Sequence, residues 1–166
     1  MMETDLQLLN TAGKMNKDAL VKIFDIYASP LYKYAILAGS DPTMADHIVG
    51  DVFSKLLDQL SKGNGPSTNL RSYLFECTYR RIISDSRYSQ RKISTEDAGL
   101  VQGEIDSILL QTIQTGLTDY QRHVILLRFY EGFSLKETAA ILGKSVNIVK
   151  ATENQAVETL QRSVCI

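Results

Sequence analysis

The sequence predicts an all-α protein built from two small helical domains, which an acidic linker joins. Apolar residues recur at helical spacing along most of the 166 residues, and no convincing period-two strand pattern appears. Turn-forming residues cluster at positions 39–42 and 62–67 and separate the apolar stripes. We therefore expect one domain at residues 1–92, a linker at 93–103, and a second domain at 104–166 that contains a helix-turn-helix.

Composition is that of an ordinary globular protein. Apolar residues make up 44% and charged residues 22% of a chain long enough for one domain or two small ones. No apolar run approaches the roughly 18 residues that span a membrane, and no signal-peptide pattern opens the sequence. Cys77 and Cys165 have neither metal-site nor disulfide-framework spacing. We expect a cytoplasmic protein without a membrane segment.

Three helices are expected in the first domain. The first covers about residues 17–38, with Leu20, Phe24, Tyr27 and Leu31 at helical spacing, and Pro30 should break or kink it. Asp41 and Pro42 suit the start of the second helix. Its apolar stripe consists of Val49, Phe53, Leu56, Leu57 and Leu60. Asn69 can cap a third helix reaching about residue 92, with Leu70, Leu74 and Cys77 on its inner face.

The charge of the chain is unevenly distributed. Residues 69–92 contain six basic and two acidic side chains, whereas residues 93–116 contain four acidic and no basic ones. Arginines interleaved with Tyr73 and Tyr79 suit partly single-stranded DNA, because guanidinium groups follow the backbone while rings stack on bases. The alternative is a solvated charged helix whose two tyrosines lie in the core, and the pattern alone slightly favours that alternative.

Short helices are expected at about residues 105–113 and 120–127, before the strongest signal in the chain. Ser134 and Glu137 form a capping box, and the following helix ends at Gly143. Ser145 can cap the next helix after a very short turn. Ala139, Gly143 and Val149 occupy the fifth, ninth and fifteenth positions from Leu135, where a tight helix crossing needs a small residue, a turn and an apolar wedge.

This spacing predicts a helix-turn-helix whose second helix enters the DNA major groove, rather than an ordinary helical hairpin. Lysines there contact phosphates and asparagines pair with adenine edges. The predicted contact residues are Lys144, Ser145, Asn147, Ile148, Lys150, Ala151 and Asn154. Because the helix is only weakly basic, with Glu153 and Glu158 against its cations, we expect weak DNA binding by this domain alone.

No catalytic or metal-binding constellation is recognised. His47 and His123 lack ligand spacing, and Asp46 and Asp51 do not share a helix face well. The Gly63-x-Gly65 segment lacks the flanking strand and helix of a phosphate loop. We therefore expect neither an enzyme nor a metal or cofactor site.

These motifs resemble those of the extracytoplasmic-function sigma factors of bacterial RNA polymerase. The resemblance covers about residues 20–92 and 104–162 in the family's order. Residues 117–134, LTDYQRHVILLRFYEGFS, look like the entry to the family's fourth conserved region, and Ala139, Gly143, Ser145 and Val149 continue it. Residues 45–53, ADHIVGDVF, look like the polymerase-binding helix of the second region, and residues 70–74, LRSYL, like the start of its promoter-reading helix.

The resemblance implies a role for each segment. A face carrying Asp46, Val49, Gly50, Asp51 and Phe53 would dock on the clamp helices of the largest polymerase subunit, and the flap would be a second polymerase contact. The loop at residues 62–69 would hold a flipped base of the −10 element, and the helix at residues 145–155 would read the −35 element. The implied −10 contacts are Lys62, Asn64, Asn69, Arg71, Arg80, Arg81, Arg87 and Arg91.

Several residues depart from the family's pattern. Gly50 stands where Gln is usual, Arg80 replaces Asn, and Ala151 and Thr152 replace Ser and Arg. These departures bear on promoter sequence and on the strength of DNA contact rather than on the fold. The family often has inhibitory anti-sigma proteins as further partners, and nothing in this sequence identifies one.

Two other functions remain open at this stage. One is a stand-alone helix-turn-helix regulator whose first domain senses a ligand or dimerises. The other is an adapter that uses a sigma-like fold for protein contacts alone, which the weak charge of residues 144–162 would fit.

Overall fold

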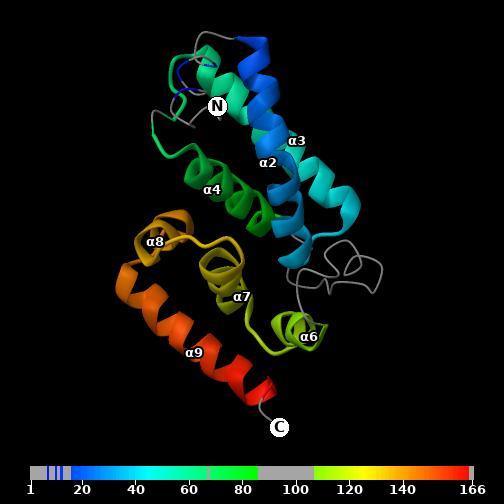
Figure 1. Ribbon diagram of the computed structural model, residues 1–166, viewed down its shortest axis with the longest axis vertical. Coiled ribbons are helices and arrows are strands. Elements are labelled where there is room, and N and C mark those ends of the chain that lie inside the picture. Colours follow the sequence, from blue (N-terminus) through cyan, green and yellow to red (C-terminus); the bar gives the residue numbers. More distant parts are fainter. Residues whose placement is uncertain are drawn as a thin grey trace.

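The protein is described by a computed structural model that defines residues 16–66, 68–85 and 107–164, together with residues 7, 10 and 12. Helices joined by turns make up these segments, and none of them contains a strand. The predicted all-α class is therefore confirmed. Figure 1 shows the helices from the first half of the chain packed above those from the second half.

The first half consists of α2 (Lys17–Leu37), α3 (Pro42–Ser61) and α4 (Leu70–Ile83), which all pack against one another. Side chains cap each helix where the backbone N–H groups lack partners. Oδ1 of Asn16 accepts from the amide of Ala19 at 3.1 Å, and Oδ1 of Asp41 accepts from Met44 at 2.7 Å. Pro42 occupies the first turn of α3, as predicted.

One expectation for α2, a break at Pro30, is wrong, and the apolar residues at helical spacing are not all buried. Its buried stripe runs through Ile23, Tyr27 and Leu31, while Phe24 is 48% exposed. The helix also continues through Pro30 without a break. Proline removes the hydrogen bond to the carbonyl of Ile26, but Ile26 lies on the exposed side of α2, where water can reach that oxygen.

The third helix is shorter than expected. It ends at Ile83, with Ser84 as its C-cap, and the hydroxyl of Ser84 donates to the carbonyl of Arg81 at 2.9 Å. At the other end, Asn69 caps the helix in a left-handed conformation with φ of 46°, which asparagine tolerates. The predicted linker at residues 93–103 lies outside the described residues.

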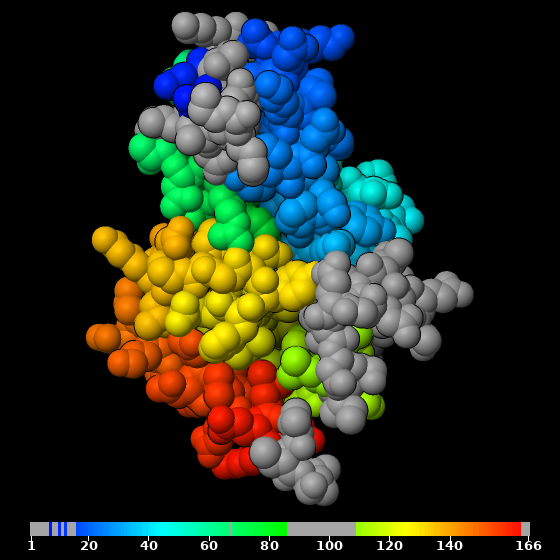
Figure 2. Space-filling model, in the orientation of Figure 1, coloured from blue at the N-terminus to red at the C-terminus, as the bar shows by residue number. Residues whose placement is uncertain are grey.

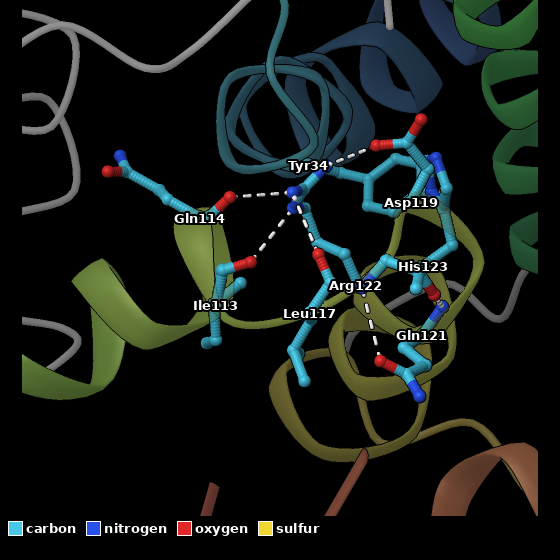
Figure 3. A network of polar contacts seen from close by, with 9 residues as sticks. Tyr34, Ile113, Gln114, Leu117, Asp119, Gln121, Arg122 and His123 are labelled. Carbon is cyan, nitrogen blue, oxygen red and sulfur yellow. Dashed lines mark hydrogen bonds and ion pairs between the residues drawn. The ribbon is translucent and has the colours of Figure 1, made fainter. Parts of the chain in front are cut away.

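The second half consists of α6 (Ser107–Thr115), α7 (Asp119–Ile125), its π-helical continuation η2 (Leu126–Tyr130), α8 (Leu135–Leu142) and α9 (Val146–Val164). Arg122 fastens α6 to α7 (Figure 3). Its guanidinium donates to the carbonyls of Ile113 and Gln114, at 2.9 and 2.7 Å, and pairs with Asp119 at 2.9 Å. A cation thus satisfies carbonyls at the end of α6, which lack helical partners.

The two halves pack on one continuous core. Tyr34 of α2, Phe75 of α4 and Phe133, which lies before α8, are fully buried in the same cluster. The rings of Phe75 and Phe133 meet edge to face with centroids 5.2 Å apart. The surface of α4 accordingly abuts the segment before α8 without a visible break in Figure 2. The predicted domain boundaries remain a prediction.

Candidate nucleic-acid interface

The helix-turn-helix has the local geometry that its sequence predicts. Oγ of Ser134 accepts from the amide of Glu137 at 3.0 Å, and the Glu137 carboxylate accepts from the amide of Ser134 at 3.1 Å. Gly143 ends α8 at φ of 66°, a region that favours glycine. Oγ of Ser145 then accepts from the amide of Ile148 at 3.2 Å and so opens α9.

The crossing of α8 and α9 is tight because small and apolar residues meet there. Ala139 is 4% exposed and Val149 fully buried. The opposite face of α9 is open to solvent at its N-terminal end, which is the part a recognition helix presents to DNA. All seven predicted contact residues are exposed there: Lys144, Ser145, Asn147, Ile148, Lys150, Ala151 and Asn154.

The acidic residues of α9 lie away from this exposed face. Glu153 is 9% exposed and pairs with Arg128 of η2 at 3.3 Å inside the helical bundle. Glu158 lies two turns beyond the lysines and pairs with Arg162 on the surface. The open end of α9 therefore presents Lys144 and Lys150 with neutral polar and apolar side chains, and its local charge is more positive than its sequence total indicates.

The predicted −10 residues lie along α4 and the turn before it. Lys62, Asn64, Asn69 and Arg80 are exposed, and Arg71 and Arg81 are partly exposed. The cations are paired within the chain: Lys62 with Asp58 at 3.1 Å, Arg80 with Glu76 at 2.6 Å and Arg81 with Asp51 at 2.9 Å. Arg71 alone of the four reaches the second half of the chain. Arg87 and Arg91 lie outside the described residues.

Tyr73 and Tyr79 fit the core interpretation better than base stacking. Both are partly buried against the hydrophobic cluster, and the Tyr79 ring meets that of His123 edge to face at 4.8 Å between centroids. Burial, with the nearby thiol of Cys77, raises the pKa of Tyr73 to about 12. Neither ring is therefore free in this arrangement to serve as a stacking platform.

A second surface lies between α2 and α3. Phe24 packs against Phe53 with tilted rings and centroids 5.0 Å apart, and beside this pair runs a shallow groove of about 430 Å³. Among the predicted polymerase-contact residues, Asp46 and Gly50 line the groove from its exposed side, and Val49, 7% exposed, forms part of its floor. A methyl group added at Gly50 would meet no neighbour, so the groove is open there.

No group of three or more His, Cys, Asp or Glu side chains converges in a metal-binding arrangement within the described residues. Cys77 lies in the core, and burial raises the pKa of its thiol, which disfavours the reactive thiolate. None of the described helices has the length and apolar character needed to cross a membrane.

Some residues of these surfaces had no individual signal in the sequence. Phe24 shares the helical spacing of core residues, and only the packing places it outside. Glu131, Phe133 and Glu137 contact the start of α4 from more than 55 positions away. No local pattern predicts such pairs, although Phe133 and Glu137 could be recognised as an apolar residue and a cap flanking α8.

Comparison with known proteins agrees with this geometry. The family model for sigma-70, region 4 matches residues 115–162, which run from the end of α6 through the helix-turn-helix. The ECF RNA polymerase sigma factor BldN of Streptomyces coelicolor is 23% identical over 171 aligned positions, which cover 95% of this chain and 64% of BldN. The ECF RNA polymerase sigma factor SigX of Bacillus subtilis is 25% identical over 84% of this chain and 80% of SigX.

Solved structures show the same fold over most of the chain. CnrH, in its complex with the cytosolic domain of CnrY, superimposes with a TM-score of 0.79 at 24% identity and covers 98% of this chain and 97% of CnrH. The sigma factor RpoE of Bartonella quintana, in complex with the anti-sigma factor NepR, gives a TM-score of 0.66 over 87% of this chain and 96% of RpoE, at 21% identity.

The fold and the open face of α9 define a helical protein with a DNA-binding helix-turn-helix domain. Residues 115–162 match the model of sigma-70, region 4. Along most of its length the chain is similar to extracytoplasmic-function sigma factors, so the resemblance predicted from the sequence is confirmed.

Proposed function

We propose that the protein is a dissociable sigma factor, which binds core RNA polymerase, recognises a two-part promoter and helps to melt it. The observation that carries this proposal is the combination of an exposed recognition helix with an upstream α2–α4 module in the order of its sigma-factor relatives. A transcriptional regulator with a helix-turn-helix alone does not need that second module.

Residues 1–92 would be the region that binds the −10 element and the polymerase, and residues 104–166 the region that binds the −35 element. Asn147 and Asn154 would contact base edges from α9, while Lys144 and Lys150 would contact phosphates. Asn69, Arg71 and the turn at residues 62–69 would hold the −10 strand. Extrusion of a base costs stacking energy, which a small pocket can offset.

The groove between α2 and α3 would receive the clamp helices of the largest polymerase subunit. Exposed aromatic surface at Phe24 and Phe53 gives apolar contact area, and Asp46 adds a charged contact at the edge of the groove. Asp51 would extend the contact from the neighbouring side of α3, where it pairs with Arg81 at 2.9 Å. Two weak DNA contacts on one rigid polymerase gain affinity through effective concentration. CnrH and RpoE were each solved with a protein partner, and an anti-sigma factor would be a corresponding partner here.

Reconstitution with core polymerase tests the proposal. Purified chain and core enzyme should together produce transcripts from a subset of promoters in a genomic library of the source organism, and neither should do so alone. Core binding without transcripts from any promoter in the library would contradict it. A pull-down from native extract, scored for the large polymerase subunits and for any small protein, would identify the partners.

The two alternatives give different results in the same experiments. A stand-alone regulator would bind specific DNA without polymerase and lose that binding only on removal of residues 104–166. A protein adapter would retain its activity when Lys144 and Lys150 are both replaced by Glu, because its contacts would not involve DNA.

A further inference from the structure

Contacts between the two halves of the chain cover the start of α4. We propose that Glu131 and Glu137 form an intramolecular clasp on Arg71 and Asn69, which keeps the −10-binding end of α4 from single-stranded DNA until the halves separate. The clasp rests on the proposed function for the identity of the DNA, but its contacts are properties of the free chain.

Arg71 is held from three directions. Its guanidinium donates to the backbone carbonyl of Glu131, pairs with the carboxylate of Glu131 at 3.3 Å, and lies 4.0 Å from the ring centroid of Phe133. The Glu131 side chain is 10% exposed, so solvent screens this ion pair less than a surface pair. A carbonyl, a carboxylate and a ring face together engage the guanidinium group through which arginine binds phosphate.

The preceding turn is held by the capping residue of α8. Nδ2 of Asn69 donates to Oε2 of Glu137 at 3.3 Å, and the hydroxyl of Ser72 lies 3.5 Å from the same oxygen. Hydrogen bonds from Ser134 and Asn69 and the charge of Arg71 lower the pKa of Glu137. This carboxylate therefore remains ionised at neutral pH and presents negative charge where the resemblance places DNA.

Bound DNA and the clasp would use the same donors. Phosphate oxygens and carboxylate oxygens both accept from guanidinium groups, and Arg71 cannot satisfy both fully at once. The other α4 cations are paired with Glu76 and Asp51 of their own half, so separation of the halves would leave them unchanged. Arg71 and Asn69 are thus the groups whose availability depends on how α8 is placed.

An equilibrium binding experiment with full-length chain tests the clasp. The double variant Glu131→Gln, Glu137→Gln should bind a fluorescein-labelled, mixed-sequence 20-nucleotide single strand more tightly by about fivefold or more, as fluorescence anisotropy measures. The matched control is Asp119→Asn, Glu158→Gln, which removes the same charge from residues that pair with Arg122 and Arg162 instead. Addition of Arg71→Ala to the double variant should abolish the gain.

Equal affinities of the double variant and the control would overturn the clasp, and so would a gain that survives Arg71→Ala. Circular dichroism establishes that each variant is folded, and Glu137→Gln alone serves if the double variant is not. Amide exchange gives a second readout, because residues 69–75 should exchange faster in the double variant and in the parent chain bound to core polymerase. Unchanged exchange in both would also overturn it. The outcome is independent of promoter-directed transcription, which tests the proposed function.

Discussion

The phenol oxygen of Tyr34 on α2 lies 2.6 Å from Nδ1 of His123 on α7, and both side chains are buried. Figure 3 shows this pair beside the Arg122 network. It is a polar contact within the apolar core that the two halves share. Burial and the neighbouring Arg122 charge lower the pKa of His123 to about 3, so the ring is neutral at pH 7 and Nδ1 can accept from the phenol.

Replacement of Tyr34 by Phe should destabilise the chain through loss of one donor. The variant keeps the ring that meets Phe75 edge to face with centroids 5.5 Å apart, but leaves Nδ1 of His123 buried without this partner. An unsatisfied buried acceptor costs about 1–3 kcal/mol. Urea unfolding followed by circular dichroism measures the difference, and Tyr79→Phe, in a partly buried tyrosine of α4, is the control. Equal stability of both variants would show that the Tyr34 contact contributes nothing.

The stability of the chain should fall in acid partly because of His123. Its folded pKa of about 3 lies below the ordinary value of 6.5, so the unfolded chain binds the extra proton between these values. The His123 contribution is therefore fully present above pH 6.5 and is lost as the pH falls toward 3. His123→Gln, whose amide oxygen can still accept from Tyr34, should show a shallower loss of unfolding free energy between pH 7 and 4.5. Parallel pH profiles for parent and variant would refute this role.

Substitutions in the turn of the helix-turn-helix should lower the stability of the chain by modest amounts. Gly143 has φ of 66°, and an added methyl group would meet no neighbour, so Gly143→Ala should cost only the conformational penalty of about 1 kcal/mol. Ser145→Ala removes the cap of α9 and should cost a similar amount. Thermal unfolding measures both, with Ser163→Ala near the end of α9 as the control. A loss well above 3 kcal/mol for Gly143→Ala would indicate a steric contact that this turn does not have.

Local signals predicted much of this architecture because they depend on neighbours in the chain. The caps at Asp41, Asn69, Ser134 and Ser145, and the glycine turn at Gly143, depend on residues within one helical turn. Helix ends without such signals were less predictable. The third helix was expected to reach residue 92, but α4 ends at Ile83, where the sequence has neither a glycine nor a proline to mark the end.

Contacts between distant segments could not be predicted in the same way. Periodicity cannot decide which of two adjacent stripes on α2 faces inward, so the helical spacing of Phe24 with Tyr27 and Leu31 did not reveal that Phe24 lies on the groove. The partners of Arg71 and Glu153 were equally inaccessible, because ion pairs over 60 and 25 positions depend on how helices pack. The candidate DNA-facing residues on α9 were predictable because one helix and its cap place them all.

The groove between α2 and α3 should decide binding to core polymerase. Phe24→Ala removes half of the Phe24–Phe53 aromatic pair while little of the core changes, because Phe24 is 48% exposed. Its affinity for core enzyme should fall about tenfold or more, as expected for an aromatic residue at the centre of an interface. Ile83→Ala, at a comparably exposed residue of α4, is the control. Equal core affinities in a competition assay would place the polymerase contact elsewhere.

Substitutions in the recognition helix should distinguish residues that read bases from residues that bind phosphates. With the variants assembled on core polymerase, Lys150→Ala should weaken all promoters alike and reduce the slope of log K against log salt by about 0.9, because one phosphate contact is lost. Asn154→Ala should instead weaken only promoters with the preferred base at one −35 position, by about 1–3 kcal/mol per site. Gln161→Ala, at an exposed glutamine of α9 beyond residues 145–155, is the control. Uniform effects of Asn154→Ala across a randomised −35 library would mean that this side chain does not read sequence, since phosphate contacts alone carry no base preference.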